Sequence, residues 1–408
     1  MSVEVSQSPL LPFVAAQPLV DHHCHGVLRA GGSASAADPT PEDLAGLLNE
    51  ADGDAVADGL PFDSLAGLAL RRWCPPLLGL APHASAGEYS GRRAALGADE
   101  VNRRFLGASG LAALCVDTGY APAGLLSSTG TTGPAETAGY AGAAAFEVVR
   151  LEQVAESLAR DGASAAGFPD AYRRALGERL GAPSFGIRVV GFKSVAAYRV
   201  GLELDGRRPG DGEVVAAVSR WLGGGPPGTP PGVADEVPRV ADEVLHRFFI
   251  WSAADLGLPI QFHVGYGDRD IDLHRCNPLL LTGLLRALEP TGVPVMLLHN
   301  YPYHREAGYL AQVFPLVYAD LGLATHNVGA RATALLAEAL ELVPLRKFLF
   351  SSDAFGLPEL YYLGTLLFRR ALSAFLADRL DAGDIGRADA ERITRLVGAE
   401  NARRVYGL

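Results

Sequence analysis

Short apolar segments alternate with longer amphipathic segments along the chain from residue 111 onward. The apolar runs fit buried parallel strands, and the segments between them have the apolar spacing of helices. Together with one earlier run they predict eight strands, at residues 18–25, 111–117, 146–152, 186–194, 259–265, 294–300, 315–321 and 347–353. Eight strand–helix units close most readily as a parallel (β/α)8 TIM-type barrel, so we predict an α/β fold of this kind.

Two segments do not fit a minimal barrel. Residues 27–110 carry helical patterns such as PEDLAGLLNE and DEVNRRFL, which predict a helical insertion or lid after the first strand. The stretch GGGPPGTPPG at 223–232 predicts a loop, because it is too rich in glycine and proline for a helix or a central strand. We expect both segments to cover the barrel mouth. The barrel is assigned to residues 1–26 and 111–408, with the last helical segment, 388–408, on its outside.

Composition narrows the choice of partners. The chain of 408 residues is 49% hydrophobic and 20% charged, which is typical of a packed globular protein. A net charge of −11 argues against nucleic acid or an anionic membrane as a partner, since both require a basic surface. There is no signal-peptide pattern at the start and no apolar run of about 18 residues. We expect a cytoplasmic protein that acts on a small molecule; a homo-oligomer is left open.

Polar side chains stand at the ends of the predicted strands, which meet on one face of a barrel. The first strand ends in DHHCH, and strict alternation puts Asp21, His23 and His25 on one face, with His22 and Cys24 on the other. Two imidazoles on one face can hold one metal ion. The later strands end in Lys193, His263, His299 and Asp353. Each alone fits a hydrogen-bonded core residue or a helix cap, but six at one barrel end predict a metal site.

Lys193 needs an explanation of its own because an ammonium group repels a divalent cation. The chain has 35 Lys and Arg residues, of which only Lys193 and Lys347 are lysines. Burial favours a neutral amine, which can react with carbon dioxide to form a carbamate, an anionic oxygen ligand that arginine cannot supply. The alternative is a lysine that binds a substrate carboxylate or pairs with Asp353. The sequence leaves both open.

The order of these residues resembles that of the amidohydrolase superfamily, in which an HxH pair is followed by Lys, His, His and Asp at successive strand ends. The phrases GFKSVAAYR, QFHVGYGD, LLHNYPYHREAGYLA, FSSDAFGLPELYYLG and NARRVYGL are similar to a narrower group. That group is the amidohydrolase-type domain that is sometimes fused to a glutamine synthetase-like domain in fungal and bacterial proteins. As a set, the phrases cover most of the chain outside the insertion.

The resemblance implies that a metal-activated water hydrolyses an amide or a related C–N bond. Imidazole ligands make zinc the first expectation, whereas carboxylate and carbamate oxygens also admit manganese or iron, as one ion or two. A bound divalent ion lowers the pKa of water towards about 7. In this interpretation Asp353 takes the proton of the water and passes it to the leaving nitrogen. His299 either completes the metal shell or polarises the substrate carbonyl.

Residues just after the strand ends are candidates for substrate contacts. They are Arg150, Glu152, Tyr198, Arg199, Tyr301, Tyr303, Arg305 and Glu359. Each alone also fits a solvated loop at the barrel top. Several arginines together suit a substrate carboxylate, because guanidinium binds carboxylate through two hydrogen bonds. We therefore expect a carboxylate-bearing substrate such as a γ-glutamyl amide.

Two other functions fit the same residues. A metal-dependent decarboxylase of the same superfamily would use this barrel without water attack, and Lys193 argues against it because that branch usually lacks a lysine on the fourth strand. A non-catalytic scaffold barrel would be marked by the loss of a ligand. None of the six candidate ligands is missing.

Overall fold

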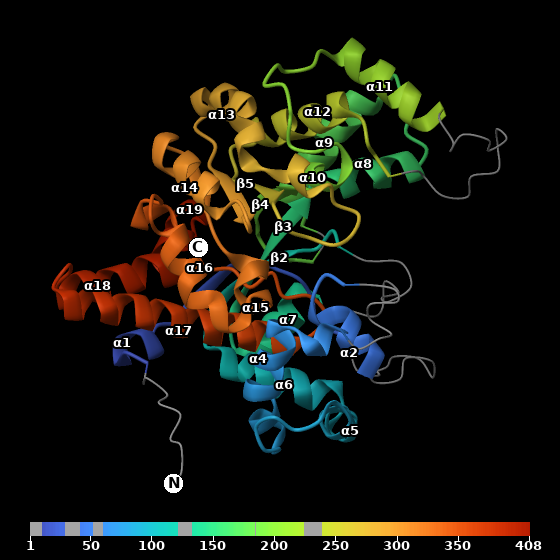
Figure 1. Cartoon of the computed structure of the whole chain (residues 1–408). Helices are drawn as coiled ribbons and strands as arrows, with labels where there is room; N and C mark the ends of the chain where they lie inside the picture. Colours follow the sequence, from blue (N-terminus) through green and yellow to red (C-terminus); the bar gives the residue numbers. More distant parts are fainter. Residues whose placement is uncertain (1–9, 29–40, 52–59, 121–132, 184, 224–238) are drawn as a thin grey trace, which may run out of the picture.

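A computed structural model describes residues 10–28, 41–51, 60–120, 133–183, 185–223 and 239–408. In this part of the chain, seven parallel strands form one sheet in sequence order and curl into a barrel surrounded by helices (Figure 1). The strands are β1 (Leu19–Cys24), β2 (Leu111–Asp117), β3 (Ala144–Arg150), β4 (Val189–Ser194), β5 (Ile260–Val264), β6 (Val295–His299) and β7 (Val317–Ala319).

The extended segment 348–353 takes the place of an eighth strand between β7 and β1. The N–H of Leu349 donates to the Ala319 carbonyl at 3.0 Å, and the N–H of His22 donates to the Phe350 carbonyl at 3.2 Å. The segment therefore bonds to a strand on each side, although its pairing is too sparse for a regular strand. The prediction of a TIM-type barrel is confirmed, while that of a regular strand at 347–353 is wrong.

Helices cover the outside of the sheet. They are α7 (Pro134–Ala141), α8 (Leu151–Arg160), α9 (Phe168–Gly181), α10 (Ala196–Arg199), α11 (Asp211–Gly223), α12 (Glu243–Ala254), α13 (Thr282–Leu288), α14 (His304–Val313), α15 (Gly322–Asn327), α16 (Ala332–Ala339) and α17 (Pro358–Ala382). A short helix, α1 (Pro12–Ala15), precedes β1. No helix among the described residues is long and apolar enough to cross a membrane.

The third strand ends two residues earlier than predicted. Arg150 is its last residue, and Leu151 begins α8. Glu152 therefore lies in a helix, where its buried carboxylate accepts hydrogen bonds from the Ser194 hydroxyl at 2.8 Å and the Val195 N–H at 2.9 Å. These bonds make it a structural tie between α8 and the end of β4, so its placement at the end of the third strand is wrong.

The described part of the insertion between β1 and β2 is helical. It contains α2 (Pro41–Leu48), η1 (Leu60–Asp63), α4 (Leu65–Trp73), η2 (Pro75–Leu78), α5 (Ala86–Leu96) and α6 (Ala98–Ser109), and α6 packs on α17 (Figure 1). A buried ion pair fastens α5 to the start of α17: Arg93 Nε lies 2.8 Å from Glu359 Oε1, which also accepts a hydrogen bond from Tyr89. The predicted glycine-proline loop lies outside the described residues, except for Gly223 at the end of α11.

The end of the last segment enters the barrel, whereas its first helix lies on the outside, beside α17 (Figure 1). The segment consists of α18 (Arg387–Arg395), a π-helical turn, η8 (Leu396–Glu400), and α19 (Asn401–Tyr406). Ala399, Ala402 and Tyr406 pack into the interior cluster with Val20 at the start of β1. Gly191 on β4 makes room for this, since a Cβ there would lie 3.3 Å from the Tyr406 ring. The predicted position is therefore wrong for η8 and α19, whose apolar side chains fill a space that the strands leave open, while α18 packs on α1 and α17 outside the barrel.

Candidate metal centre

Four of the predicted ligands converge at the carboxyl ends of the strands, around the carboxylate of Asp353. Its Oδ1 lies 3.0 Å from Nε2 of His23 and 3.3 Å from Nε2 of His25. Its Oδ2 lies 3.5 Å from Nε2 of His299. The Lys193 ammonium joins them, with Nζ 3.3 Å from Nε2 of His23. Residues from β1, β4, β6 and the closing segment thus meet in one cluster.

His263 lies beside this cluster, at the end of β5. Its ring centroid is 4.6 Å from that of His299 and 4.6 Å from that of Tyr198. Its Nε2 lies 3.1 Å from the Tyr266 carbonyl, which holds the ring in place. All six predicted ligands therefore stand at the same barrel end, as expected from the strand-end rule.

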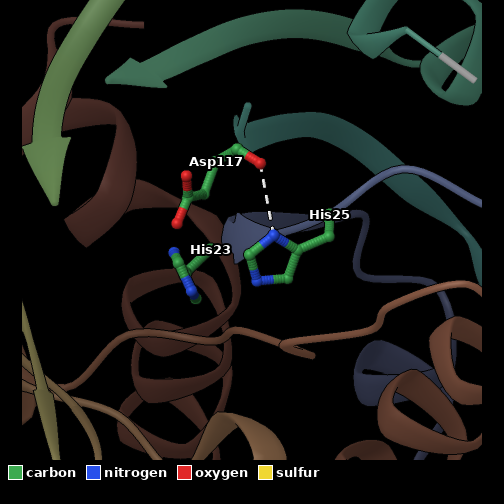
Figure 2. A group of neighbouring side chains, drawn as sticks. All are labelled: His23, His25 and Asp117. Carbon is green, nitrogen blue, oxygen red and sulfur yellow. Dashed lines mark hydrogen bonds between the residues drawn. The ribbon is translucent and has the colours of Figure 1, made fainter. Parts of the chain in front are cut away.

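Asp117, the last residue of β2, is a site residue that the sequence analysis missed. Its carboxylate and ring nitrogens of His23 and His25 all lie within 4.8 Å of one another (Figure 2). Nδ1 of His25 lies 3.2 Å from the Asp117 carbonyl, and the Asp117 carboxylate accepts hydrogen bonds from Arg150 at 2.5 and 3.1 Å. The signal was present, because Asp117 ends the predicted strand 111–117.

His22 points into the barrel, although strict alternation would turn it away from the side of His23. Its Nδ1 lies 2.9 Å from the Tyr406 hydroxyl and its Nε2 lies 2.7 Å from Asp320. Asp21, assigned to the face of the ligands, instead accepts a hydrogen bond from the Ser352 hydroxyl. The pairing of β1 with β2 shifts register between Asp21 and Cys24, and this irregularity breaks the simple alternation. The face predicted for His22 is wrong.

Burial sets the charge of the cluster. It lowers the pKa of His23 to about 4 and those of His263 and His299 well below the ordinary value, so the rings are neutral at pH 7, the form that binds metals. Burial alone would raise the pKa of Asp353, but the neighbouring imidazoles hold it well below its ordinary value. Burial lowers the pKa of Lys193 to about 8, against the opposing effect of nearby carboxylates.

The backbone is left-handed at three positions of the site, two of them consecutive. His299, Asn300 and Asp353 have φ angles of 70°, 61° and 52°, a region that residues other than glycine seldom adopt. Asp320 holds the first of them, because its Oδ1 accepts the His299 N–H at 2.6 Å. Such conformations persist where surrounding contacts enforce them, and they gather at functional sites.

The residues fit a divalent cation. Both ring nitrogens of His299 and Oδ1 of Asp353 are buried without a hydrogen-bond partner among the described residues. A buried polar atom without a partner costs about 1–3 kcal/mol, so these atoms require a further ligand. His23, His299 and Asp353 also offer donor atoms within 4.8 Å of one another. Imidazole and carboxylate donors together suit zinc, manganese or iron.

The insertion contributes a carboxyl group near the site. Glu50 follows α2, and its pKa is raised to about 8 by burial and, next, by the negative charges of Asp353 and Asp268. Burial and, next, the same carboxyl group raise the pKa of Tyr198, which lies beside His263. No motif marks Glu50, since it belongs to the insertion and not to a strand end.

Two of the residues proposed for substrate contacts have aromatic neighbours at this barrel end. Tyr198 packs on His263 and is mostly buried, whereas Tyr301 is 37% exposed and stacks on His304. Tyr303 lies nearby on the same loop and donates to the Leu273 carbonyl.

The charged residues proposed for substrate contacts already have partners. Arg199 lies 3.2 Å from Glu156, and Arg305 lies 2.9 Å from Glu341 on the outer surface. Glu359 is fully buried in the ion pair that anchors the insertion. The structure thus does not gather Arg199, Arg305 and Glu359 around the candidate metal ligands.

A sequence comparison decides the family. The amidohydrolase family model matches residues 144–408, which include β3 to β7, the closing segment and four of the six candidate ligands. The chain belongs to the amidohydrolase family. This amidohydrolase is also 35% identical over 231 residues to protein fluG of Emericella nidulans, a match that covers 54% of the chain. The chain spans only 26% of that relative.

Solved structures agree with the family. The amidohydrolase superposes with a TM-score of 0.78 on a candidate metal-dependent hydrolase from Lactobacillus casei ATCC 334, with 29% identity over 97% of this chain and 96% of that one. A glucuronate isomerase from Caulobacter crescentus has a TM-score of 0.62 and 14% identity, covering 97% of this chain and 93% of that one. At that identity the second likeness shows the fold alone.

Proposed function

We propose that the chain is a metal-dependent hydrolase that cleaves an amide or a related C–N bond by attack of water. The observation that carries the proposal is the convergence of three buried imidazoles on the ionised carboxylate of Asp353. Membership of the amidohydrolase family and the likeness to a candidate metal-dependent hydrolase support it.

His23, His25, His299 and Asp353 would hold the ion, with Asp117 and Lys193 within reach of the same place. We propose zinc first, with manganese or iron as alternatives, as one ion or two. When bound, such an ion lowers the pKa of water and polarises a carbonyl oxygen. His263, beside His299, would complete the ligand set.

Asp353 would act as the base. Its low pKa keeps it ionised at neutral pH, so an oxygen of its carboxylate can accept a proton from water and return it to the leaving nitrogen. Lys193 would either supply an anionic carbamate ligand or remain a cation that binds a substrate carboxylate. His299, whose ring nitrogens have no hydrogen-bond partner among the described residues, would bind the ion or the substrate carbonyl.

The proposed substrate carries a carboxylate, such as a γ-glutamyl amide. Arg199 lies next to Tyr198 and the site, but it pairs with Glu156. A substrate carboxylate would therefore have to displace Glu156 from Arg199, or bind an unmodified Lys193. Tyr301 and Arg305 belong to the same proposal, although Arg305 faces Glu341.

The test combines metal analysis with an amide library that includes γ-glutamyl amides. We expect about one or two zinc, manganese or iron ions per chain, loss of hydrolysis after chelation, and recovery on adding metal back. Asp353→Asn, which keeps the size of the side chain, should abolish turnover. Full activity in metal-free protein, or release of carbon dioxide without amide cleavage, would overturn the proposal.

A further inference from the structure

A chain of buried hydrogen bonds lies under the metal centre and begins at Gln261 on β5. The Gln261 amide nitrogen donates to the His22 carbonyl at 2.8 Å and to the Tyr406 hydroxyl at 2.8 Å. A backbone carbonyl only accepts hydrogen bonds, so the NH2 end of the amide must face it. The amide oxygen therefore faces His23 Nδ1, at 2.8 Å. His23 must carry its proton on Nδ1, which leaves the lone pair of Nε2 directed at Asp353.

The hydrogen bonds at the other end of this network, around Tyr406 and His22, lead to the same assignment of donors and acceptors. The Tyr406 hydroxyl accepts from Gln261, so it donates its own hydrogen to His22 Nδ1 at 2.9 Å. Nε2 of His22 then carries a hydrogen and donates to Asp320 Oδ2 at 2.7 Å. Asp320 accepts this hydrogen, because the Nδ1 of His22 is already an acceptor and an imidazole must carry a hydrogen on at least one of its nitrogens. Each donor and each acceptor in this hydrogen-bond network is thus assigned without conflict.

Asp320 also connects this chain to a second candidate ligand. Its Oδ1 accepts the N–H of His299 at 2.6 Å and that of Gly322 at 3.0 Å, and its Oδ2 accepts from the Ser351 hydroxyl at 2.9 Å. His299 is one of the left-handed residues of the site, so Asp320 helps to fix its backbone. One buried network therefore reaches from His23 to His299.

We propose that Tyr406, near the end of the chain, is a positioning residue of the metal centre, acting through Gln261 on His23 and through His22 and Asp320 on His299. The proposal rests on the proposed function in requiring a metal at this site. Partners that orient metal-binding histidines from behind commonly change metal affinity by about 10- to 100-fold when they are removed.

The decisive variant is Tyr406→Phe, because the ring contacts beside Gly191 stay and only the hydroxyl is lost. Tyr172→Phe is the matched control: Tyr172 is also fully buried, and its hydroxyl donates to the Leu151 carbonyl at 3.1 Å in α8, away from the ligands. Metal affinity is measured by competition with a chelator, and the stability of the metal-free proteins by thermal unfolding.

We expect Tyr406→Phe to weaken zinc affinity by about 10- to 100-fold and Tyr172→Phe to leave it unchanged, while both lower the stability of the metal-free protein. Cobalt-substituted Tyr406→Phe should also show an altered visible absorption spectrum. Gln261→Leu removes the acceptor of His23 directly and should weaken zinc affinity at least as much, even if Tyr406→Phe does not fold.

Two results would overturn the inference, and they are distinguishable. Wild-type protein that binds no metal would remove the proposed function and this inference with it. Wild-type affinity in Tyr406→Phe, with lowered stability alone, would overturn the inference and leave the proposed function standing. If Gln261→Leu also kept wild-type affinity, the network would only stabilise the barrel.

Discussion

The ammonium nitrogen of Lys193 lies 3.3 Å from Nε2 of His23, the same imidazole nitrogen that faces Asp353. Lys193 is only 2% exposed, and burial lowers its pKa to about 8. About a tenth of an amine with this pKa is neutral at pH 7, and the neutral amine is the form that reacts with carbon dioxide. The position of Lys193 among the ligands therefore keeps the carbamate and the cation both chemically reasonable.

Lys193→Arg distinguishes a carbamate at this position from a lysine that stays a cation. It keeps a positive charge and nearly the length of the side chain, but a guanidinium stays protonated and forms no carbamate. If a carbamate binds the metal, both metal content and turnover should be lost. Lys347→Arg is the matched control, because this half-buried lysine only donates to the carbonyls of Ala311 and Phe314. It should leave metal content unchanged.

Chemical rescue of Lys193→Ala gives an independent reading of the same question. Recovery of activity with short carboxylic acids would indicate a missing anionic ligand, whereas recovery with amines would indicate a missing cation. Near-normal metal content and turnover in Lys193→Arg would rule out the carbamate.

The strand-end rule was enough to group the candidate ligands that converge in this barrel. Residues as far apart as His23 and Asp353 could be grouped because parallel strands of a barrel place their carboxyl ends on one face. The same rule applied to 111–117 would also have found Asp117. The position of these side chains at one end of the barrel could thus be predicted from the periodicity of the strands alone.

What could not be predicted depends on contacts between distant segments. The face of His22 follows from a register shift in β1, and alternation carries no signal of such a shift. The entry of Tyr406 into the barrel depends on the space beside Gly191. The partners of Arg199 and Glu359 come from helices whose packing no local pattern reveals.

Glu359→Gln tests whether this residue serves the insertion or the substrate. Its carboxylate is fully buried against Arg93, and removing one partner of a buried ion pair costs about 3–5 kcal/mol. We expect the free energy of unfolding to fall by that amount while the Michaelis constant of the folded enzyme stays unchanged. Glu341→Gln, which breaks the exposed pair with Arg305, should change the free energy of unfolding far less, because water screens that pair. A raised Michaelis constant at normal stability would instead support the substrate contact.

His326 should make stability depend on pH. It is buried, and burial lowers its pKa from 6.5 to about 4. The unfolded chain therefore binds a proton before the folded one does, so stability present above about pH 6.5 is lost as the pH falls towards about 4. Between about pH 7.5 and about pH 5 the loss from this residue is about 2 kcal/mol. In denaturant unfolding of metal-free protein, this loss should be smaller by that amount in His326→Gln than in the wild type. His83→Gln, at an exposed position, is the control for the substitution itself.

Gly322→Ala should damage the metal centre without removing any functional atom. A Cβ at this position would lie 2.4 Å from the Ser351 hydroxyl and 3.2 Å from Nδ1 of His299. Ser351 would have to leave Asp320, to which it donates at 2.9 Å, and the His299 ring would have to tilt. We expect metal affinity to fall about tenfold or more, as it does when second-layer contacts of a ligand are lost.

Gly139→Ala is the control for that substitution, because nothing lies within 4 Å of its added Cβ in α7. Alanine in place of glycine at an unstrained helical position stabilises a protein by about 0.4–1 kcal/mol, because it lowers the conformational entropy of the unfolded chain. This variant should therefore keep its metal and unfold at a slightly higher temperature. Chelator competition on both variants checks the comparison. Equal affinities would mean that Ser351 and His299 tolerate the extra methyl group, and that His299 is not held as tightly as its contact with Asp320 indicates. A loss confined to Gly322→Ala would show that the geometry of His299, and not the mere presence of its ring, sets the affinity of the site.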